Sequence, residues 1–135
     1  MTQFYTLLLL CSITSAAYSQ ESVFSFGLKR QDAKSIITLN TIKKFPCKNY
    51  LMDTRDYQNA DTIIIVVKDF MPPSPCSGPR SEIEEKFIYV PSAKRFYIKL
   101  WYKGKFDEWR VFQLDTAYLV RPEGVTFSKY LEEKN

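Results

Sequence analysis

The sequence Thr62-Ile63-Ile64-Ile65-Val66-Val67 decides the fold class of this chain. Every residue after the threonine is isoleucine or valine, and the polar residues Asp61 and Lys68 bound the run on its two sides. β-Branched side chains favour strands, and the run is shorter than the roughly ten residues that a buried helix needs. We therefore predict a β-strand here, with both of its faces buried.

The stretch Arg95–Tyr102 shows the clearest alternation in the chain. One set of its side chains is purely apolar, and the other set mixes aromatic and basic groups. Alternate residues of a strand point to opposite faces of a sheet, so the apolar set should face a core. Together with alternate residues of the first run, it gives the predicted core, which consists of Ile63, Ile65, Val67, Phe96, Ile98 and Leu100.

Similar short runs occur on both sides of these two stretches, and no convincing helical pattern interrupts them. Turn residues separate the runs, as at Pro91–Lys94 and Lys103–Lys105. About 7–9 strands at such spacing predict an all-β chain folded as a single antiparallel β-sandwich, with a small barrel as the alternative. The remaining expected strands are Ser22–Leu28, Ser35–Thr41, Lys86–Val90, Phe106–Leu114, Ala117–Val120 and Val125–Ser128.

Residues 1–19 have the features of a secretory signal peptide. They carry no charged side chain, and an apolar stretch is followed by the small-x-small sequence Ala17-Tyr18-Ser19. We expect cleavage before Gln20, a single domain over residues 20–135, a secreted or periplasmic location and no membrane span after cleavage. A lipoprotein acylated at Cys11 and an uncleaved anchor are the alternatives.

Two cysteines, Cys47 and Cys76, remain after the expected cleavage. An even pair in an exported chain predicts a disulfide bond. A redox or nucleophilic thiol is the alternative, but the pair lacks the CxxC spacing and a histidine to activate it. The bond would fasten the proline-rich connection 69–81 to the strand expected at 48–52.

The composition excludes several functions. The 135-residue chain contains no histidine, which removes Ser-His-Asp and Cys-His catalysis and any His-ligated metal site. Its formal net charge is +4, and basic residues alternate with acidic ones rather than forming a block. We therefore expect no nucleic-acid partner, no cofactor and no metal.

Two acidic constellations carry weak signals. The segment Asp53–Asp61 supplies oxygen atoms that could bind a hard cation, but it lacks the glycine and glutamate of an EF-hand, and we interpret it as a polar hairpin loop. Asp107 and Glu108 are adjacent on an expected strand and would point to opposite faces, which does not suit paired-carboxylate catalysis. We expect that the protein is not an enzyme.

Framework motifs point to a family. The chain contains Phe45-Pro46-Cys47-Lys48-Asn49-Tyr50, then Asp61–Ile65, then a proline-rich stretch with Cys76, and finally Phe96–Leu100. In these motifs it resembles small exported immunoglobulin-like proteins of Gram-negative bacteria. The resemblance covers about two thirds of the mature chain and implies an immunoglobulin-like sandwich in the cell envelope. A tryptophan between the framework cysteines, as in antibody domains, is absent.

A stripe of aromatic and basic residues is the candidate binding site. If the second face of the strand Arg95–Tyr102 is open to solvent, its aromatic and basic groups form a platform for a partner. If both faces are covered, the same aromatic side chains belong to the core. The candidate residues are Tyr97, Lys99 and Trp101, with Trp109 and Arg110 on the following strand.

Two functions follow from these features. The first is a non-catalytic exported domain that binds a protein or glycan of the cell envelope through the Trp101 face. The alternative is a protease-inhibitor module that presents the disulfide-anchored proline loop 69–81, because a constrained loop loses little entropy on binding. The sequence leaves the partner and the oligomeric state open.

Overall fold

A computed structural model describes residues 21–132 of the chain; the predicted signal peptide lies outside these residues. The described part is all-β, with one disulfide, and contains no helix that could cross a membrane. Its nine strands are β1 (Phe24–Gln31), β2 (Lys34–Thr41), β3 (Leu51–Asn59), β4 (Thr62–Met71), β5 (Glu84–Tyr89), β6 (Arg95–Tyr102), β7 (Lys105–Gln113), β8 (Tyr118–Gly124) and β9 (Ser128–Tyr130).

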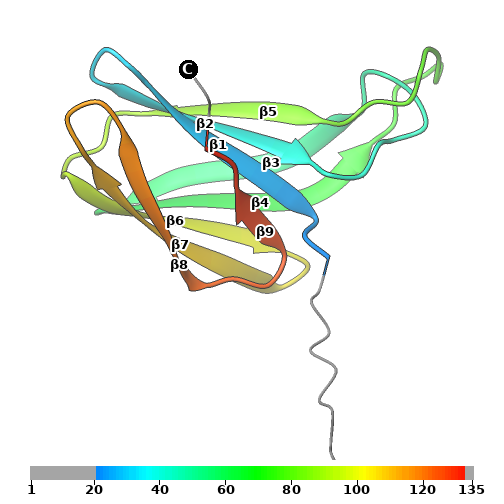
Figure 1. The fold of residues 1–135 in the computed structure, drawn as a ribbon. Helices are drawn as coiled ribbons and strands as arrows, with labels where there is room; N and C mark the ends of the chain where they lie inside the picture. Colours follow the sequence, from blue (N-terminus) through cyan, green and yellow to red (C-terminus); the bar gives the residue numbers. More distant parts are fainter. Residues whose placement is uncertain (1–20, 133–135) are drawn as a thin grey trace, which may run out of the picture.

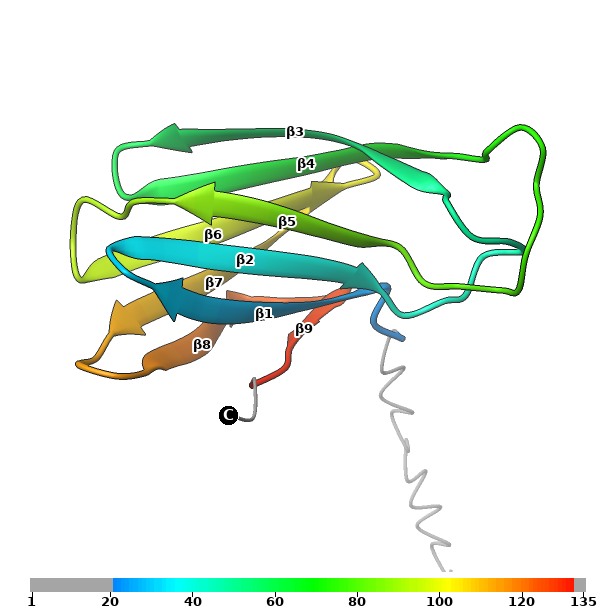
Figure 2. The same ribbon diagram turned by 90° about the horizontal axis from the view of Figure 1, so that it is seen from above.

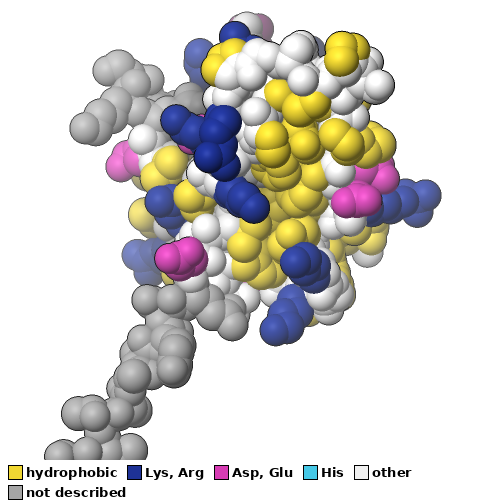
Figure 3. Space-filling model, turned by 90° about the vertical axis from the view of Figure 1, so that its right-hand side faces the viewer, with side chains coloured by type: hydrophobic (Ala, Val, Ile, Leu, Met, Phe, Trp, Pro, Cys, Tyr) yellow, Lys and Arg dark blue, Asp and Glu magenta, His cyan; other side chains and the backbone are white. Residues whose placement is uncertain are grey.

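The strands form two sheets that face each other as a sandwich (Figures 1 and 2). One sheet has the order β5-β2-β1-β9, and the other has the order β3-β4-β6-β7-β8. Successive strands run in opposite directions, so the connections alternate between the two ends of the sandwich. Figure 3 looks onto the end that carries the connections 42–50 and 72–83.

The sheets are mixed, so the expectation of purely antiparallel pairing is wrong for two pairs. β4 pairs with β6 in parallel, and β1 pairs with β9 in parallel. The first pair is parallel because β5, which lies between the two strands in the sequence, belongs to the opposite sheet. The chain therefore crosses the sandwich and returns to the five-stranded sheet in its original direction.

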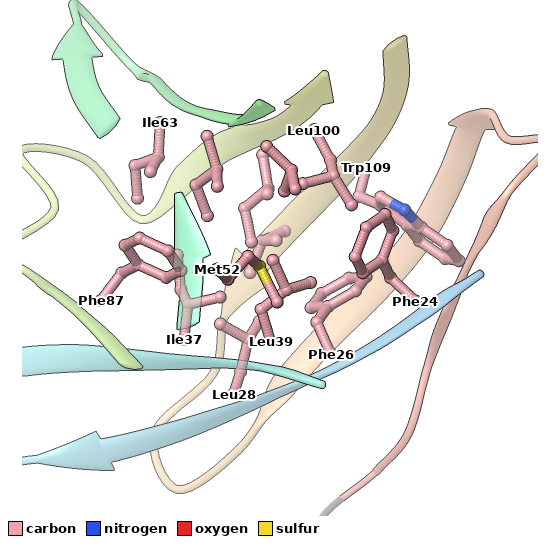
Figure 4. Close-up of a cluster of buried hydrophobic side chains, with 14 of the residues drawn as sticks. Phe24, Phe26, Leu28, Ile37, Leu39, Met52, Ile63, Phe87, Leu100 and Trp109 are labelled. Carbon is pink, nitrogen blue, oxygen red and sulfur yellow. The ribbon is translucent and has the colours of Figure 1, made fainter. Parts of the chain in front are cut away.

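Apolar side chains of both sheets meet between the layers and form the core (Figure 4). The six residues predicted from alternation are all buried, which confirms that part of the prediction. Phenylalanine and aliphatic side chains of β1 and β2 pack against them from the four-stranded sheet. These additional core residues include Phe24, Phe26, Leu28, Ile37 and Leu39.

The expected polar hairpin loop Asp53–Asp61 is a strand for most of its length. Residues 53–59 belong to β3, and only 60–61 form the turn to β4. β3 is an edge strand with a β-bulge at Asp53/Thr54, and Met52 is its one buried residue. An edge strand needs few apolar residues, so the sequence carries no alternation that would have marked it.

Two further details differ from the expectations. The run Thr62–Val67 is fully buried on its core side but only partly on its outward side: Ile64 is buried there, whereas Val66 is partly exposed. The last two strands lie further along the chain than predicted. β8 extends to Gly124 and includes Pro122, which is tolerated because β8 is an edge strand.

The predicted Cys47–Cys76 disulfide is present and spans 29 residues of sequence. It ties the connection 42–50 to the connection 72–83. Next to it, Phe45 and Ser81 exchange two backbone hydrogen bonds of 2.8 and 3.1 Å. The proline-rich connection is thus fixed to its neighbour at two places.

Polar contacts join the two sheets along the margins of the sandwich. The Tyr89 hydroxyl of β5 donates a hydrogen bond to Asp56 of β3. Burial of the phenol, this hydrogen bond and the negative charge of Asp56 all raise the pKa of Tyr89 above its ordinary value. Between β2 and β8, the hydroxyl groups of Ser35 and Tyr118 lie 2.6 Å apart in a second hydrogen bond.

Candidate functional site

The outward side of the five-stranded sheet, here called the outer face, carries the predicted binding stripe. Alternation places it opposite the core-facing residues, and no other element of residues 21–132 forms a layer over it. Its members are Arg55 and Tyr57 on β3, Ile64 and Val66 on β4, Tyr97, Lys99 and Trp101 on β6, Phe106, Glu108, Arg110 and Phe112 on β7, and Leu119 and Arg121 on β8.

An aromatic pair lies on the outer face beside the turn between β6 and β7. Trp101 and Phe106 are cross-strand partners, and their ring centroids are 4.8 Å apart with a tilt of 42°. Trp101 is partly exposed, and 43% of Phe106 is exposed. The ammonium group of Lys99 lies 4.5 Å from the centroid of the Phe106 ring, a cation–π contact. These three side chains form one packed cluster on an open surface.

A second cluster lies further along the same strands. The guanidinium carbon of Arg110 is 5.9 Å from the centroid of the Tyr97 ring, and Nη2 of Arg110 forms a 2.6 Å ion pair with Glu123. The Nε atom of Arg110 is buried and has no hydrogen-bond partner among the described residues. The arginine is thus held in place by one ring and one carboxylate.

Two shallow hollows flank the aromatic pair. The first lies between Trp101 and β3 and is lined by aromatic and aliphatic side chains, with lysines at its border. The second lies beside Phe106, between the Arg110 cluster and the connection to β9. The first hollow is lined by Tyr57, Val66, Val67, Lys68, Trp101, Tyr102, Lys103 and Gly104.

The outward side of the four-stranded sheet is different in character. The alternation of side chains along the strands places small, polar and charged residues there, together with Ile36 and Ile88. None of the outward-pointing residues of β1, β2 and β5 is aromatic. The two outward surfaces therefore differ in composition, and the aromatic groups gather on one of them. This asymmetry is what distinguishes the outer face as a candidate site.

Of the five predicted site residues, one, Trp109, does not lie on the outer face. Tyr97, Lys99, Trp101 and Arg110 share the outer face, but Trp109 points into the core (Figure 4). Its neighbour Arg110 faces outward, so strand geometry sends the indole inward. Its Nε1 atom donates a 2.9 Å hydrogen bond to Ser128, which satisfies the one polar atom of the buried ring.

Among the outer-face residues that the prediction did not name, three apolar or aromatic ones line the two hollows: Tyr57, Val66 and Phe106. Phe106 could have been found from parity, because it alternates with Glu108 and Arg110 along β7. Tyr57 was missed because its segment was interpreted as a loop. Val66 was missed because its strand was expected to be buried on both sides.

The acidic residues considered for chemistry lie apart. Asp107 is fully buried, whereas Glu108 is partly exposed on the outer face, so the predicted divergence of the two carboxylates is confirmed. Within residues 21–132, no group of three or more cysteine or acidic residues is placed to hold a metal ion. Asp53, Asp56 and Asp61 are distributed along β3 and its turn.

Comparisons with protein-family models, with curated proteins and with solved structures found no match for this chain. The structure assigns it to the class of all-β sandwich domains with one disulfide. The resemblance to immunoglobulin-like proteins stays a prediction.

Proposed function

We propose that the protein is an exported, non-catalytic binding domain that contacts a protein or glycan of the cell envelope through its outer face. The observation that carries the proposal is the Trp101–Phe106 pair, which lies partly exposed on an uncovered sheet, beside the β6–β7 turn and between two hollows. Packed aromatic groups beside depressions are the usual anchors of binding surfaces.

The composition of the outer face supports a protein partner more strongly than a neutral glycan. Tyrosine, tryptophan, phenylalanine and arginine are enriched in protein interfaces, and all four occur here. Sugars stack on free ring faces, but cations already lie over the rings of Phe106 and Tyr97. A protein can instead insert an apolar side chain into the hollow beside Trp101 and pair acidic groups with Lys99.

The test is an affinity capture from envelope extract, followed by measurement of the dissociation constant for the captured partner. Trp101→Ala should weaken binding about 30-fold, the equivalent of about 2 kcal/mol for a central aromatic contact. Ile88→Ala is the matched control, because Ile88 is 60% exposed on the outward side of the opposite sheet. It should leave the dissociation constant unchanged.

Equal weakening by both variants, or no effect of Trp101→Ala on a partner that the wild type binds, would assign the contact to another surface. A glycan array run with the same three proteins separates the two partner classes. Binding to a defined glycan that depends on Trp101 would favour the glycan form of the proposal.

The second candidate function, protease inhibition, is supported by the connection 72–83. Residues 74–80 are all exposed, while the disulfide and the Phe45–Ser81 bridge restrict the movement of the connection. Titration against a panel of proteases tests this function. Inhibition that is lost when Pro72 or Pro75 is replaced, and retained in Trp101→Ala, would favour the inhibitor over the outer-face binder.

A further inference from the structure

The connections at the two ends of the sandwich differ in charge. The end in Figure 3 carries the connections 42–50, 72–83, 103–104 and 125–127, and we call it the basic end. Its connections contain one acidic residue, Glu82, and the basic residues Lys43, Lys44, Lys48, Arg80 and Lys103. The opposite connections, 32–33, 60–61, 90–94 and 114–117, contain the basic residue Lys94 and the acidic residues Asp32, Asp61 and Asp115.

The cations of the basic end form no ion pair among the described residues. Neither of the ion pairs found in residues 21–132 uses a basic residue of these connections. Lys103 lies over the Tyr102 ring, 5.3 Å from its centroid, and the aliphatic stem of Lys48 lies beside Gly78. Glu82 and Glu84 line one hollow with Lys44 and Arg80, whereas Lys43, Lys48 and Lys103 are not part of that lining.

Exposed apolar side chains lie among these cations. Leu51 and Met71 face each other where β3 begins and β4 ends, and they are 60% and 43% exposed. Ile42 is also exposed, as are Pro72 and Pro75. Figure 3 shows hydrophobic side chains gathered in a band on this end, with basic side chains on more than one side of the band.

Packed aromatic rings and the disulfide support the backbone that carries these apolar side chains. Behind Leu51 and Met71, the Phe45 ring packs 5.0 Å from both the Tyr50 and the Phe70 rings. The disulfide joins the two longest connections of this end. The backbone of these connections is therefore fastened by the disulfide and by the Phe45–Ser81 bridge.

This composition differs from that of a protein interface. Lysine is depleted in protein–protein interfaces, whereas here lysines predominate and tryptophan is absent from the connections. Aliphatic groups surrounded by lysine and arginine are typical of surfaces that bind bilayers, where apolar groups enter the acyl boundary and cations attract anionic headgroups. The aromatic anchors suited to a protein partner lie on the outer face instead.

We propose that the basic end docks on a bilayer that contains anionic lipids, with Leu51 and Met71 entering the boundary between headgroups and acyl chains. The strands then run roughly perpendicular to the membrane surface, and the opposite end of the sandwich points away from it. Leu51 and Met71 are not part of the Trp101–Phe106 cluster, so this inference does not rest on the proposed binding function.

The test is co-sedimentation of the natively produced protein with vesicles. One set of vesicles contains phosphatidylcholine alone, and the other contains phosphatidylcholine mixed with phosphatidylglycerol. Binding should require phosphatidylglycerol and weaken as salt is added. Lys43→Glu/Lys44→Glu should reduce the partition coefficient by about tenfold or more. Leu51→Ser/Met71→Ser should also reduce it, while the melting temperature stays near that of the wild type, because both side chains are exposed.

The matched control uses the opposite end, where Leu114 is 51% exposed and Lys94 is basic. Leu114→Ser/Lys94→Glu should partition like the wild type. Binding that is absent, equal on both vesicle types, or weakened equally by the control would overturn the proposal. Sedimentation velocity gives the last outcome: a dimer that only the Leu51/Met71 variant dissociates would assign the basic end to a second copy of the chain.

Discussion

The Oδ2 atom of Asp107 accepts a 2.6 Å hydrogen bond from the hydroxyl group of Ser128, and this contact joins β7 of one sheet to β9 of the other. The same carboxylate accepts hydrogen bonds from the backbone amides of Thr126, Phe127 and Ser128 and from the Thr126 hydroxyl. Ser128 Oγ in turn accepts from Trp109. Both oxygen atoms of the buried Asp107 carboxylate therefore accept hydrogen bonds.

Replacement of Asp107 should strongly destabilise the protein. Asp107→Ala leaves several buried donors without a partner, and we expect the free energy of unfolding to fall by about 3–5 kcal/mol. Urea denaturation measures the change. Glu108→Gln, next to it but on the outer face, should change stability by less than about 0.5 kcal/mol. Similar small effects of both variants would show that the carboxylate does not hold the β8–β9 connection.

The disulfide should account for a large part of the stability. Closure of a loop between residues separated by 29 positions restricts the unfolded chain, which corresponds to about 3–4 kcal/mol. Cys47→Ala/Cys76→Ala and reduction of the wild type should lower the denaturation midpoint by similar amounts. The double variant itself should not respond to reductant. A wild type whose midpoint is unchanged by full reduction would contradict this expectation.

The sequence was sufficient to predict the elements that carry strong patterns. β6 was found with its bounds, because Phe96, Ile98 and Leu100 alternate with polar or amphipathic groups. The cysteine pairing followed from counting the cysteines of an expected exported chain. Local patterns also separated Asp107 from Glu108, since strand parity requires no knowledge of the rest of the fold.

Features that depend on distant parts of the chain could not be predicted. β3 is a strand because β4 provides its hydrogen-bond partners, although its residues are mostly polar. The parallel pairs depend on the crossing of β5 to the other sheet. The hydrogen-bond donors to Asp107 come from residues about twenty positions further along the chain, and no local sequence pattern predicts this contact.

Tyr89 should make stability depend on pH in alkaline solution. Its pKa is raised in the folded state, so its contribution is complete below the unfolded value of about 10 and is lost as the pH rises towards the folded pKa. Tyr89→Phe should lose about 1 kcal/mol at neutral pH with the hydrogen bond to Asp56. It should also show a shallower loss of stability above about pH 10 than the wild type.

Urea denaturation at neutral and alkaline pH provides this measurement. Tyr57→Phe is the matched control, because Tyr57 lies on β3 next to Asp56 but is exposed on the outer face. It should follow the wild-type pH dependence. An alkaline profile of Tyr89→Phe that is parallel to the wild type would show that Tyr89 does not carry the effect.

The two tryptophans should respond oppositely to substitution because they lie on opposite sides of one sheet. Trp109 is buried in the core, so Trp109→Ala should cost about 3–5 kcal/mol of unfolding free energy. Trp101 is partly exposed and packs mainly on Phe106, so Trp101→Ala should cost no more than about 1 kcal/mol. In the single-tryptophan variants, iodide should quench the fluorescence of Trp101 more strongly than that of Trp109. If Trp101→Ala unfolds the domain as readily as Trp109→Ala, Trp101 is a core residue, and the outer face cannot be the open platform that the proposed function requires.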